Sequence, residues 1–455
     1  MSTPTRQAVA TALVLALSTG ACGTADPPAP PAGSTLKATL ADRDGDGRLE
    51  SGPPEPLIDR TDIGPRREAG RVLATLGVLT DAHVRDEESP ARVPFLDRLG
   101  EPYDSTFRPQ EALTTQVLAA TVRALNAEDP DAVLVAGDLI DSASRTELAQ
   151  AQAVLDGGAV DPDTGAPGYD GVQHAGNADP FYYRPDVDPP VRAGLLAAAQ
   201  RPFESPGLDA PWHATAGNHD ALLAGELAPD ARTDEIATGD RVVTAPPPGF
   251  DADAFPDPRD AIEVLLDTGT TERVAPDPER AALVAGAAPG AGDRVVRAGA
   301  ATVVLLDSTD RRGGAAARVT QAQLDWLETT LEDAATRSVL VASHHPLPDE
   351  ALAVLDRHPN VVAALNGHTH RHRITPHAGY WLISTASLAD FPQQSRMIRV
   401  REHAIETWVV DHDGRDLAGT SRELAFLDAQ GGRPKGFPGR PPDRNARLFT
   451  PPRAP

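Results

Sequence analysis

Side chains that bind metal ions follow several short apolar runs of this chain, each at the point where the run ends. Carboxylate, imidazole and amide groups suit borderline divalent ions such as Zn, Mn, Fe, Ni or Co. A thiolate site is excluded, since Cys22 is the only cysteine. Seven such ligands are too many for one ion and suit two, provided that one carboxylate bridges them. They are Asp81, His83, Asp138, Asn218, His344, His368 and His370.

Two pairs of these side chains lie two residues apart in the sequence. Asp81 with His83, and His368 with His370, would point to the same side if their segments were extended. Chemistry in α/β proteins lies at strand ends, so we expect both pairs to converge on one pocket there.

The apolar runs that precede these residues are short and rich in Val and Leu, as buried strands are. Helical patterns lie between them, and Thr320 with Gln323 forms a capping box for one helix. One face of another predicted helix carries Leu113, Val117, Thr121 and Leu125. Strands that alternate with helices predict a layered α/β architecture, which residues 396–412 would close as an antiparallel hairpin.

Five short motifs, taken in order, resemble a known family. Asp-x-His, Gly-Asp, Gly-Asn-His-Asp, His-His-Pro and Gly-His-Thr-His each follow an apolar run, from about Arg71 to Arg373. This order resembles the calcineurin-like metallophosphoesterase superfamily, which includes purple acid phosphatases and class III cyclic-nucleotide phosphodiesterases. The resemblance implies a four-layer α/β/β/α sandwich with long loop insertions, and a centre of two divalent or mixed-valence metal ions at the strand ends.

The resemblance also implies the role of each side chain. The first ion would be held by Asp81, His83 and His370, and the second by Asn218, His344 and His368, with Asp138 as the bridge. A family member hydrolyses a phosphoester with a hydroxide that bridges the two ions, which fits the general chemistry of paired metals. His219 would contact the phosphoryl oxygen or protonate the leaving alkoxide, and Asp220 would orient the His219 ring.

Several polar residues near the motifs have a structural and a functional interpretation. His345 is interpreted as a packing residue or a neighbour of the ligands, with direct ligation as the alternative. Asp141 is interpreted as a loop residue that hydrogen-bonds the backbone. Arg371, His372 and Arg373 would either line the phosphate pocket or be ordinary exposed strand residues.

The chain as a whole divides into a catalytic domain with extensions at both ends. We expect the metallophosphoesterase domain over residues 71–430, interrupted by turn-rich insertions at 142–211 and 221–300. The first insertion contains the aromatic stretch FYYRP, either a stacking wall for a nucleobase or a packing element. Residues 431–455 form a basic, Pro-rich tail that could dock on the acidic body or remain flexible.

The N-terminal part carries two further signals. Residues 1–22 have the pattern of a signal peptide, and Cys22 after small residues resembles a lipoprotein processing site, although Thr19 stands where Leu is usual. We therefore expect an exported protein, either secreted or a cell-envelope lipoprotein that contacts the membrane through Cys22. Residues 23–70 read as a tether and an N-terminal arm.

Within the N-terminal arm, three carboxylates have the spacing of a calcium loop. Its first ligand positions would be Asp42, Asp44 and Asp46. Pro53 stands at the twelfth position, where that loop needs Glu, so any calcium site is expected to be weak.

The charge of the chain limits its partners. Lys plus Arg number 42 and Asp plus Glu 66, which gives a net charge of −24 and argues against a stable nucleic-acid partner. A phosphodiester carries one negative charge and a phosphomonoester two, so the scarcity of basic residues near the motifs favours small-molecule phosphodiesters. The alternatives are a phosphomonoesterase of the acid phosphatase kind and a non-catalytic, metal-stabilised envelope binding protein.

Overall fold

A computed structural model describes residues 33–99, 107–284, 286–414, 416–431 and 437–452. The predicted signal peptide (residues 1–22) with Cys22 lies outside the described residues, and so do Arg433, Lys435 and Arg453 of the tail. Among the described residues, every helix is too short or too polar to cross a lipid bilayer.

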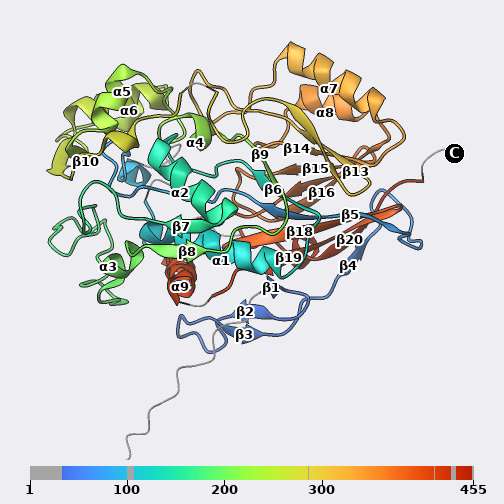
Figure 1. Ribbon diagram of the computed structural model, residues 1–455, viewed down its shortest axis with the longest axis horizontal. Coiled ribbons are helices and arrows are strands. Elements are labelled where there is room, and N and C mark those ends of the chain that lie inside the picture. The colour runs from blue at the N-terminus through green and yellow to red at the C-terminus, as the bar shows by residue number, and fades with distance from the viewer. Residues whose placement is uncertain (1–32, 100–106, 285, 415, 432–436, 453–455) are drawn as a thin grey trace, which may run out of the picture.

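Two mixed β-sheets form the centre of the fold (Figure 1). The first has the order β4-β20-β19-β18-β5-β6-β9, with β1 paired to β19, and the second has the order β12-β13-β14-β15-β17-β16. The strands of the first sheet are β1 (Gly33–Ser34), β4 (Ile58–Arg60), β5 (Val72–Leu79), β6 (Ala132–Ala136), β9 (Trp212–Thr215), β18 (Gln394–Arg401), β19 (Ala404–Asp411) and β20 (Ala446–Phe449). Those of the second are β12 (Arg294–Ala298), β13 (Ala301–Leu305), β14 (Val339–Ala342), β15 (Val361–Asn366), β16 (Arg373–His377) and β17 (Tyr380–Ser384).

Strand direction decides where the motifs meet. In the first sheet β5, β6 and β9 are parallel, and in the second β13, β14, β15 and β17 are parallel. Parallel strands end at the same edge of a sheet, so the residues that follow them gather there. The predicted hairpin is confirmed as the antiparallel pair β18 and β19, and β18 pairs with β5.

The two sheets pack face to face and each is covered by helices on its outer side. Leu76 and Leu134 of the first sheet share one apolar cluster with Val303 and Trp381 of the second. The outer side of the first sheet packs on α1 (Thr114–Asn126) and α2 (Arg145–Asp156).

Helices α7 (Gln321–Asp333) and α8 (Asp349–Leu355) cover the second sheet through Leu327, Leu331 and Leu355 (Figure 1). The predicted four-layer α/β/β/α sandwich is therefore confirmed.

Local sequence explains the helices of these layers. The buried face of α1 contains Val117, Thr121 and Leu125, as its periodicity predicts. At the start of α7, Thr320 Oγ1 accepts the backbone N–H of Gln323 at 3.3 Å, and Gln323 Oε1 accepts that of Thr320 at 2.9 Å. The predicted capping box is confirmed.

The two insertions are not structureless. The first contains β7 (Gly158–Val160), α3 (Leu195–Ala199) and β8 (Phe203–Ser205) besides α2, and the second contains α5 (Ala231–Ala237), β10 (Arg241–Ala245), α6 (Pro258–Thr268) and β11 (Thr270–Arg273). Tyr182 of FYYRP is buried in a cluster with Ile262 and Leu265 of α6, and its hydroxyl donates to the Thr244 carbonyl oxygen at 2.7 Å. A ring buried in this way cannot stack on a nucleobase, so the packing interpretation holds for Tyr182.

The first sheet extends beyond the predicted domain bounds of 71–430. β20 of the tail pairs with β19 and with β4 of the arm. Leu448 and Phe449 are buried, while Arg447 lies 3.1 Å from Glu406 and Arg444 lies 2.8 Å from Glu55. The described part of the tail thus docks on the body through a short strand and ion pairs.

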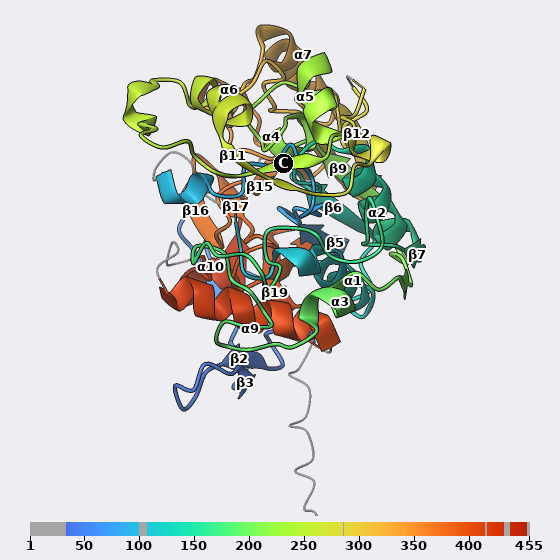
Figure 2. The ribbon, with the colours of Figure 1, turned by 90° about the vertical axis from the view of Figure 1, so that its left-hand side faces the viewer.

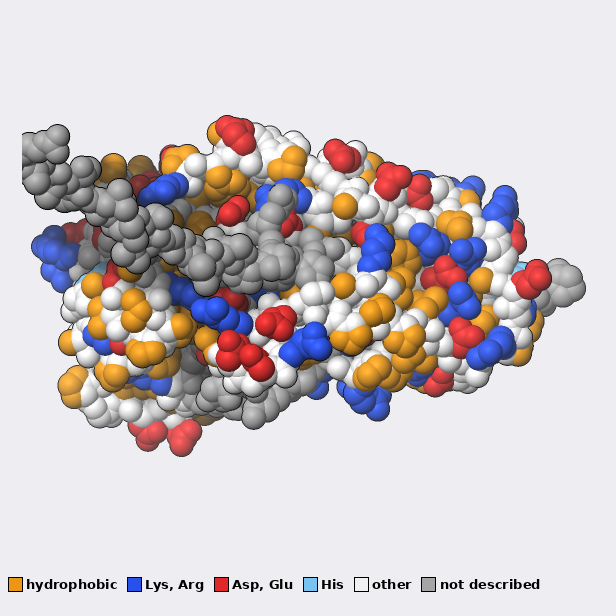
Figure 3. Space-filling view, turned by 90° about the horizontal axis from the view of Figure 1, so that it is seen from below, with side chains coloured by type: hydrophobic (Ala, Val, Ile, Leu, Met, Phe, Trp, Pro, Cys, Tyr) orange, Lys and Arg blue, Asp and Glu red, His pale blue; other side chains and the backbone are white. Residues whose placement is uncertain are grey.

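The remaining elements are short strands and helices outside the two central sheets. They are β2 (Thr39–Ala41), β3 (Glu50–Gly52), η1 (Leu96–Leu99), η2 (Glu111–Leu113), η3 (Ala252–Ala254), η4 (Pro278–Arg280), α4 (Asn218–Ala221), α9 (Asp416–Gly431) and α10 (Pro441–Arg444). Figure 2 shows α9 running across the lower part of the molecule, above β2 and β3, and α9 also contacts α1. On the face shown in Figure 3, acidic and basic side chains are intermixed.

Candidate metal centre

The proposed ligands lie in the segments that follow five parallel strands. Asp81 and His83 follow β5, and Asp138 follows β6. Asn218 begins α4 after β9, while His344 follows β14 and His368 with His370 follows β15. Six of the seven side chains are buried and the seventh, His368, is half-buried. The structure therefore brings all seven together at one edge of the sheets.

The backbone reaches this arrangement in a different way from the extended segments that we predicted. Five of the seven residues have left-handed backbone, with φ of 50° at Asp81, 43° at His83, 48° at Asp138, 63° at His368 and 52° at His370. Each such non-glycine residue costs on the order of 1–3 kcal/mol, and this strain gathers at functional sites. The pairs converge because the chain turns sharply after each strand, so the prediction of extended segments is wrong.

Glycines allow these turns to approach one another closely. A Cβ at Gly217 would overlap the Asp138 carboxylate, and a Cβ at Gly367 would overlap the Thr80 hydroxyl. Only glycine fits such contacts. The Gly-Asn and Gly-His steps of the motifs therefore let segments that follow four strands, β5, β6, β9 and β15, share one site.

Asp81, His83 and His370 form one group of possible ligands. One ligand atom from each lies within 4.8 Å of the others. His370 Nε2 is 3.3 Å from both Asp81 Oδ1 and His83 Nε2. Two imidazole nitrogens at this distance beside a carboxylate oxygen fit a shared cation.

Asp138 joins this group to a second one. Its Oδ2 lies 3.9 Å from His83 Nε2 and 3.0 Å from His344 Nε2. Among the described residues, the buried Oδ1 of Asn218 has no hydrogen-bond partner, while the amide Nδ2 donates to the Gly225 carbonyl oxygen at 3.1 Å. Asp138, Asn218 and His344 thus present oxygen and nitrogen atoms that suit a second cation.

Hydrogen bonds at Nδ1 fix the tautomers of three of the four proposed histidine ligands, His83, His344 and His370. His344 Nδ1 lies 2.9 Å from the Ala136 carbonyl oxygen, which can only accept, so Nδ1 carries the proton. In His83 and His370 the partner of Nδ1 is a carboxylate. In the neutral ring each Nε2 then keeps a lone pair, with which it can bind a metal ion.

The carboxylate behind His83 is Asp141. It lies 2.9 Å from His83 Nδ1 and accepts two hydrogen bonds from Arg85, at 2.8 and 2.7 Å, while Arg85 also contacts Glu111 at 2.9 Å. Although burial opposes ionisation, Arg85 holds the pKa of Asp141 well below its usual range. The interpretation of Asp141 as a residue that only hydrogen-bonds the backbone is wrong, because its side chain orients a proposed ligand.

The carboxylate behind His370 is Asp390, which sequence reasoning missed. Asp390 contacts His370 Nδ1 and accepts from Arg108 Nε at 2.6 Å. It follows the apolar run of β17, as the ligands follow theirs, and this was the signal available in the sequence. The contact itself depends on the turn after β15 and cannot be inferred from spacing.

His219 lies beside these groups, and Asp220 does not contact its ring. His219 Nδ1 donates to the Asp141 carbonyl oxygen at 2.7 Å, which leaves Nε2 for a substrate. Asp220 instead accepts the backbone N–H groups of Ile140 at 3.1 Å and Gly217 at 2.8 Å. The prediction that Asp220 orients His219 is wrong, because neighbouring residues of a helical turn point in different directions.

The other residues with two interpretations are also placed by the structure. His372 is buried and its Nδ1 lies 2.9 Å from Arg396 Nη2, so it belongs to the protein interior. Arg371 and Arg373 are exposed. His345 is buried next to His344, with one ligand atom each of His344, His345 and His368 within 4.8 Å.

The three carboxylates of the acidic loop in the arm lie close together. Asp42, Asp44 and Asp46 each place one carboxylate oxygen within 4.8 Å of the others, and Asp42 accepts the backbone N–H of Gly45 at 2.7 Å. Calcium at this loop stays a prediction, which a calcium titration would test.

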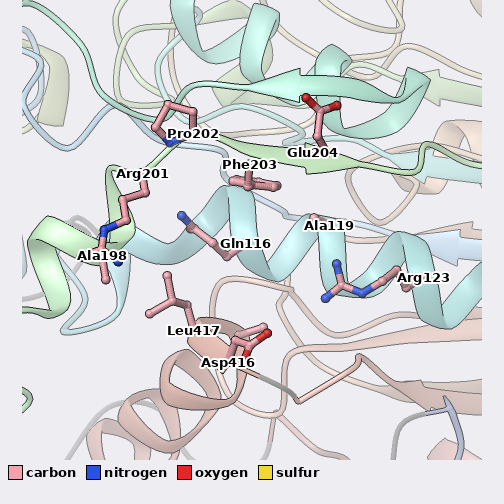
Figure 4. Close-up of a pocket in the computed structure, with 11 residues that line it drawn as sticks. Gln116, Ala119, Arg123, Ala198, Arg201, Pro202, Phe203, Glu204, Asp416 and Leu417 are labelled. Atoms are coloured by element: carbon pink, nitrogen blue, oxygen red, sulfur yellow. The ribbon is translucent and has the colours of Figure 1, made fainter.

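A separate pocket of about 400 Å³ lies between α1, β8 and the start of α9 (Figure 4). Figure 4 shows Gln116, Ala119 and Arg123 along α1 on one side and Asp416 with Leu417 on the other. None of its lining residues is a proposed ligand, so this pocket is not the candidate centre.

Charges inside the centre predict how metal binding depends on pH. Burial opposes protonation, yet Asp81 and Asp390 raise the pKa of His370 to about 10, and Asp138 raises that of His344 to about 9. Without metal both rings are therefore protonated at neutral pH, and an ion must displace these protons. We expect Mn affinity to rise with pH, by up to roughly a hundredfold per pH unit for two protons, in a chelator competition below about pH 9. An affinity independent of pH would contradict this assignment.

Comparison with known proteins gives the family. A model of the calcineurin-like phosphoesterase family matches residues 74–372, which is more than half of the chain. A dimetal phosphatase from Danio rerio is 14% identical over 75% of this chain and 97% of that chain, with a TM-score of 0.39. The structure of PhoD is 13% identical over 79% of this chain and 69% of that chain, with a TM-score of 0.34. No curated protein sequence matches as a relative.

The family model spans all five motifs, from the strand that precedes Asp81 to the segment that follows His370. The chain therefore belongs to the calcineurin-like phosphoesterase family and is a metal-dependent hydrolase that acts on phosphoester bonds.

Proposed function

We propose that this enzyme prefers phosphodiesters to phosphomonoesters. The observation that carries the proposal is the pairing of the arginines behind the centre: Arg85 binds Asp141, and Arg108 binds Asp390. Their charges are balanced within the protein, whereas a dianionic monoester needs additional cationic donors. A monoanionic diester matches such a site better.

The chain's own residues divide the work of hydrolysis. Asp81, His83, Asp138, Asn218, His344, His368 and His370 would hold two ions, which supply Lewis acidity toward phosphoryl oxygens and a reactive water nucleophile when bound. His219 presents Nε2 to the substrate while its Nδ1–H is held by the Asp141 carbonyl oxygen. A protonated His219 can then donate to the leaving alkoxide.

A pair of chromogenic substrates tests the diester preference. The Mn-loaded protein is assayed with a nitrophenyl phosphodiester and with the matching monoester, and kcat/KM is compared. We expect the diester to have the higher kcat/KM and both activities to disappear with a chelator. A higher value for the monoester would support the alternative, a phosphomonoesterase of the acid phosphatase kind.

The alternative from another class is an envelope protein in which bound metal serves structure only. The partly exposed side chain of His219 argues against this alternative. It places a proton donor next to the buried ligands, and a metal ion that serves structure only does not need one. Two bound ions without turnover of either substrate would favour the binding protein.

We also propose that the protein is exported and carries a lipid on Cys22. The uncharged stretch from Ala8 to Leu17 and the small residues before Cys22 support this. Metabolic labelling with a palmitate analogue should mark the wild-type protein and not the Cys22→Ala variant. An unlabelled wild-type protein recovered from the medium would indicate a secreted form.

A further inference from the structure

Neither the proposed metal ligands nor the proposed proton donor includes His345, whose ring is buried. The residue is 1% exposed, and its Nε2 has no hydrogen-bond partner among the described residues. Its ring centroid lies 4.7 Å from that of His344 and 4.5 Å from that of His368. An unpaired polar nitrogen in this position is unfavourable unless something fills the site.

The hydrogen bonds of Ser308 indicate which nitrogen of His345 carries the proton. The Ser308 hydroxyl is fully buried and accepts the backbone N–H of His345 at 3.3 Å. Its own hydrogen needs an acceptor, and His345 Nδ1 lies 2.8 Å away. If Nδ1 accepts this hydrogen, the proton of the neutral ring is on Nε2.

This tautomer is opposite to that of three proposed ligand histidines. In His83, His344 and His370, Nδ1 meets a carboxylate or a carbonyl oxygen and Nε2 keeps its lone pair. In His345 the hydroxyl of Ser308 reverses the pattern, so Nε2 is a donor and cannot bind a metal ion. A donor beside His344 and His368 needs an anionic or polar acceptor.

We propose that His345 Nε2–H donates a hydrogen bond to a phosphoryl oxygen of the bound substrate or product, and that Ser308 holds the ring in this tautomer. The proposal rests on the phosphoester hydrolysis described above and adds a substrate-binding residue to it. It does not depend on whether diesters or monoesters are preferred.

Inorganic phosphate, the simplest anion with the same oxygens, is the probe for this contact. Calorimetric titration of phosphate into the Mn-loaded protein is compared for wild type, His345→Phe and Ser308→Ala. The lost hydrogen bond to a charged group should weaken phosphate binding in His345→Phe by roughly ten- to a hundredfold. Ser308→Ala should weaken it less, because the donor remains but its tautomer is no longer held.

Metal content separates this role from ligation. Elemental analysis of each variant should give the same number of Mn ions per chain as wild type. Loss of an ion from His345→Phe would overturn the proposal, because it would make His345 a metal ligand. Unchanged phosphate affinity in a His345→Phe protein that keeps its metal ions would also overturn it. If His345→Phe does not fold, the phosphate affinity and the Mn content of Ser308→Ala test the proposal instead. A change in diester preference would bear on the proposed function and leave this inference intact.

Discussion

Asp138→Asn is expected to lower kcat/KM for phosphoester hydrolysis by at least about a thousandfold, because two ions held together supply several kcal/mol of transition-state stabilisation. Asp138 Oδ2 is the oxygen that lies near both His83 and His344. An asparagine keeps an acceptor for the His219 backbone N–H, which Asp138 Oδ1 binds at 2.9 Å, while it removes the negative charge. The fold should therefore persist while the paired centre is lost.

Metal analysis and a surface control complete this test. The Asp138→Asn protein should bind fewer Mn ions than wild type and show an unchanged circular dichroism spectrum. The control is Asp209→Asn, the same change at an exposed carboxylate, and it should retain full activity. Full activity in Asp138→Asn would show that this carboxylate does not join the two groups of ligands.

His219→Ala is expected to lower kcat by roughly a hundred- to ten-thousandfold with metal content unchanged, as removal of a general acid does. The loss should be larger for an alkyl diester than for a nitrophenyl diester, because an alkoxide leaving group needs a proton more than a nitrophenolate does. Rates for both substrates in both proteins provide the measurement.

Asp220→Asn is the matched comparison for His219→Ala. The Asp220 carboxylate binds the backbone N–H groups of Ile140 and Gly217, and an amide can accept only one of them. For Asp220→Asn we expect a lower melting temperature, from a loss of about 1–3 kcal/mol in the free energy of unfolding, and the same dependence of the rate on the leaving group as in wild type.

An equal loss of kcat for both substrates in His219→Ala would argue that His219 binds the phosphoryl group and does not protonate the leaving group.

Much of the centre could be predicted because its motifs combine residue type, spacing and a preceding apolar strand. The carboxyl ends of β5, β6, β14 and β15 place Asp81, Asp138, His344 and His368 together, as parallel strands require. The family resemblance then implied the division between two ions.

Contacts between residues that are distant in sequence could not be predicted in the same way. Asp390 meets His370, and Asp141 meets His83, only because left-handed turns after the strands aim the imidazoles at these carboxylates. Asp220 was misassigned because it is adjacent to His219 in sequence, whereas the helical turn of α4 directs the two side chains to different partners.

The edges of the fold show a second limit of sequence patterns. β4 and β20 have three and four residues, so neither carries enough apolar alternation to be recognised as a strand. β20 pairs with β19 and β4 pairs with β20, and ion pairs such as Arg447 with Glu406 join this edge to the sheet. Residues 446–449 of the tail therefore belong to the first sheet although the composition of the tail resembles that of a linker.

The most direct test of the two-ion centre is anomalous diffraction from crystals of the Mn-loaded protein. We expect two Mn peaks about 3.5–4 Å apart, which is the usual separation in two-metal sites. One peak should contact Asp81, His83 and His370, the other Asn218, His344 and His368, with Asp138 between them. A single peak, or peaks bound by other residues, would contradict the account.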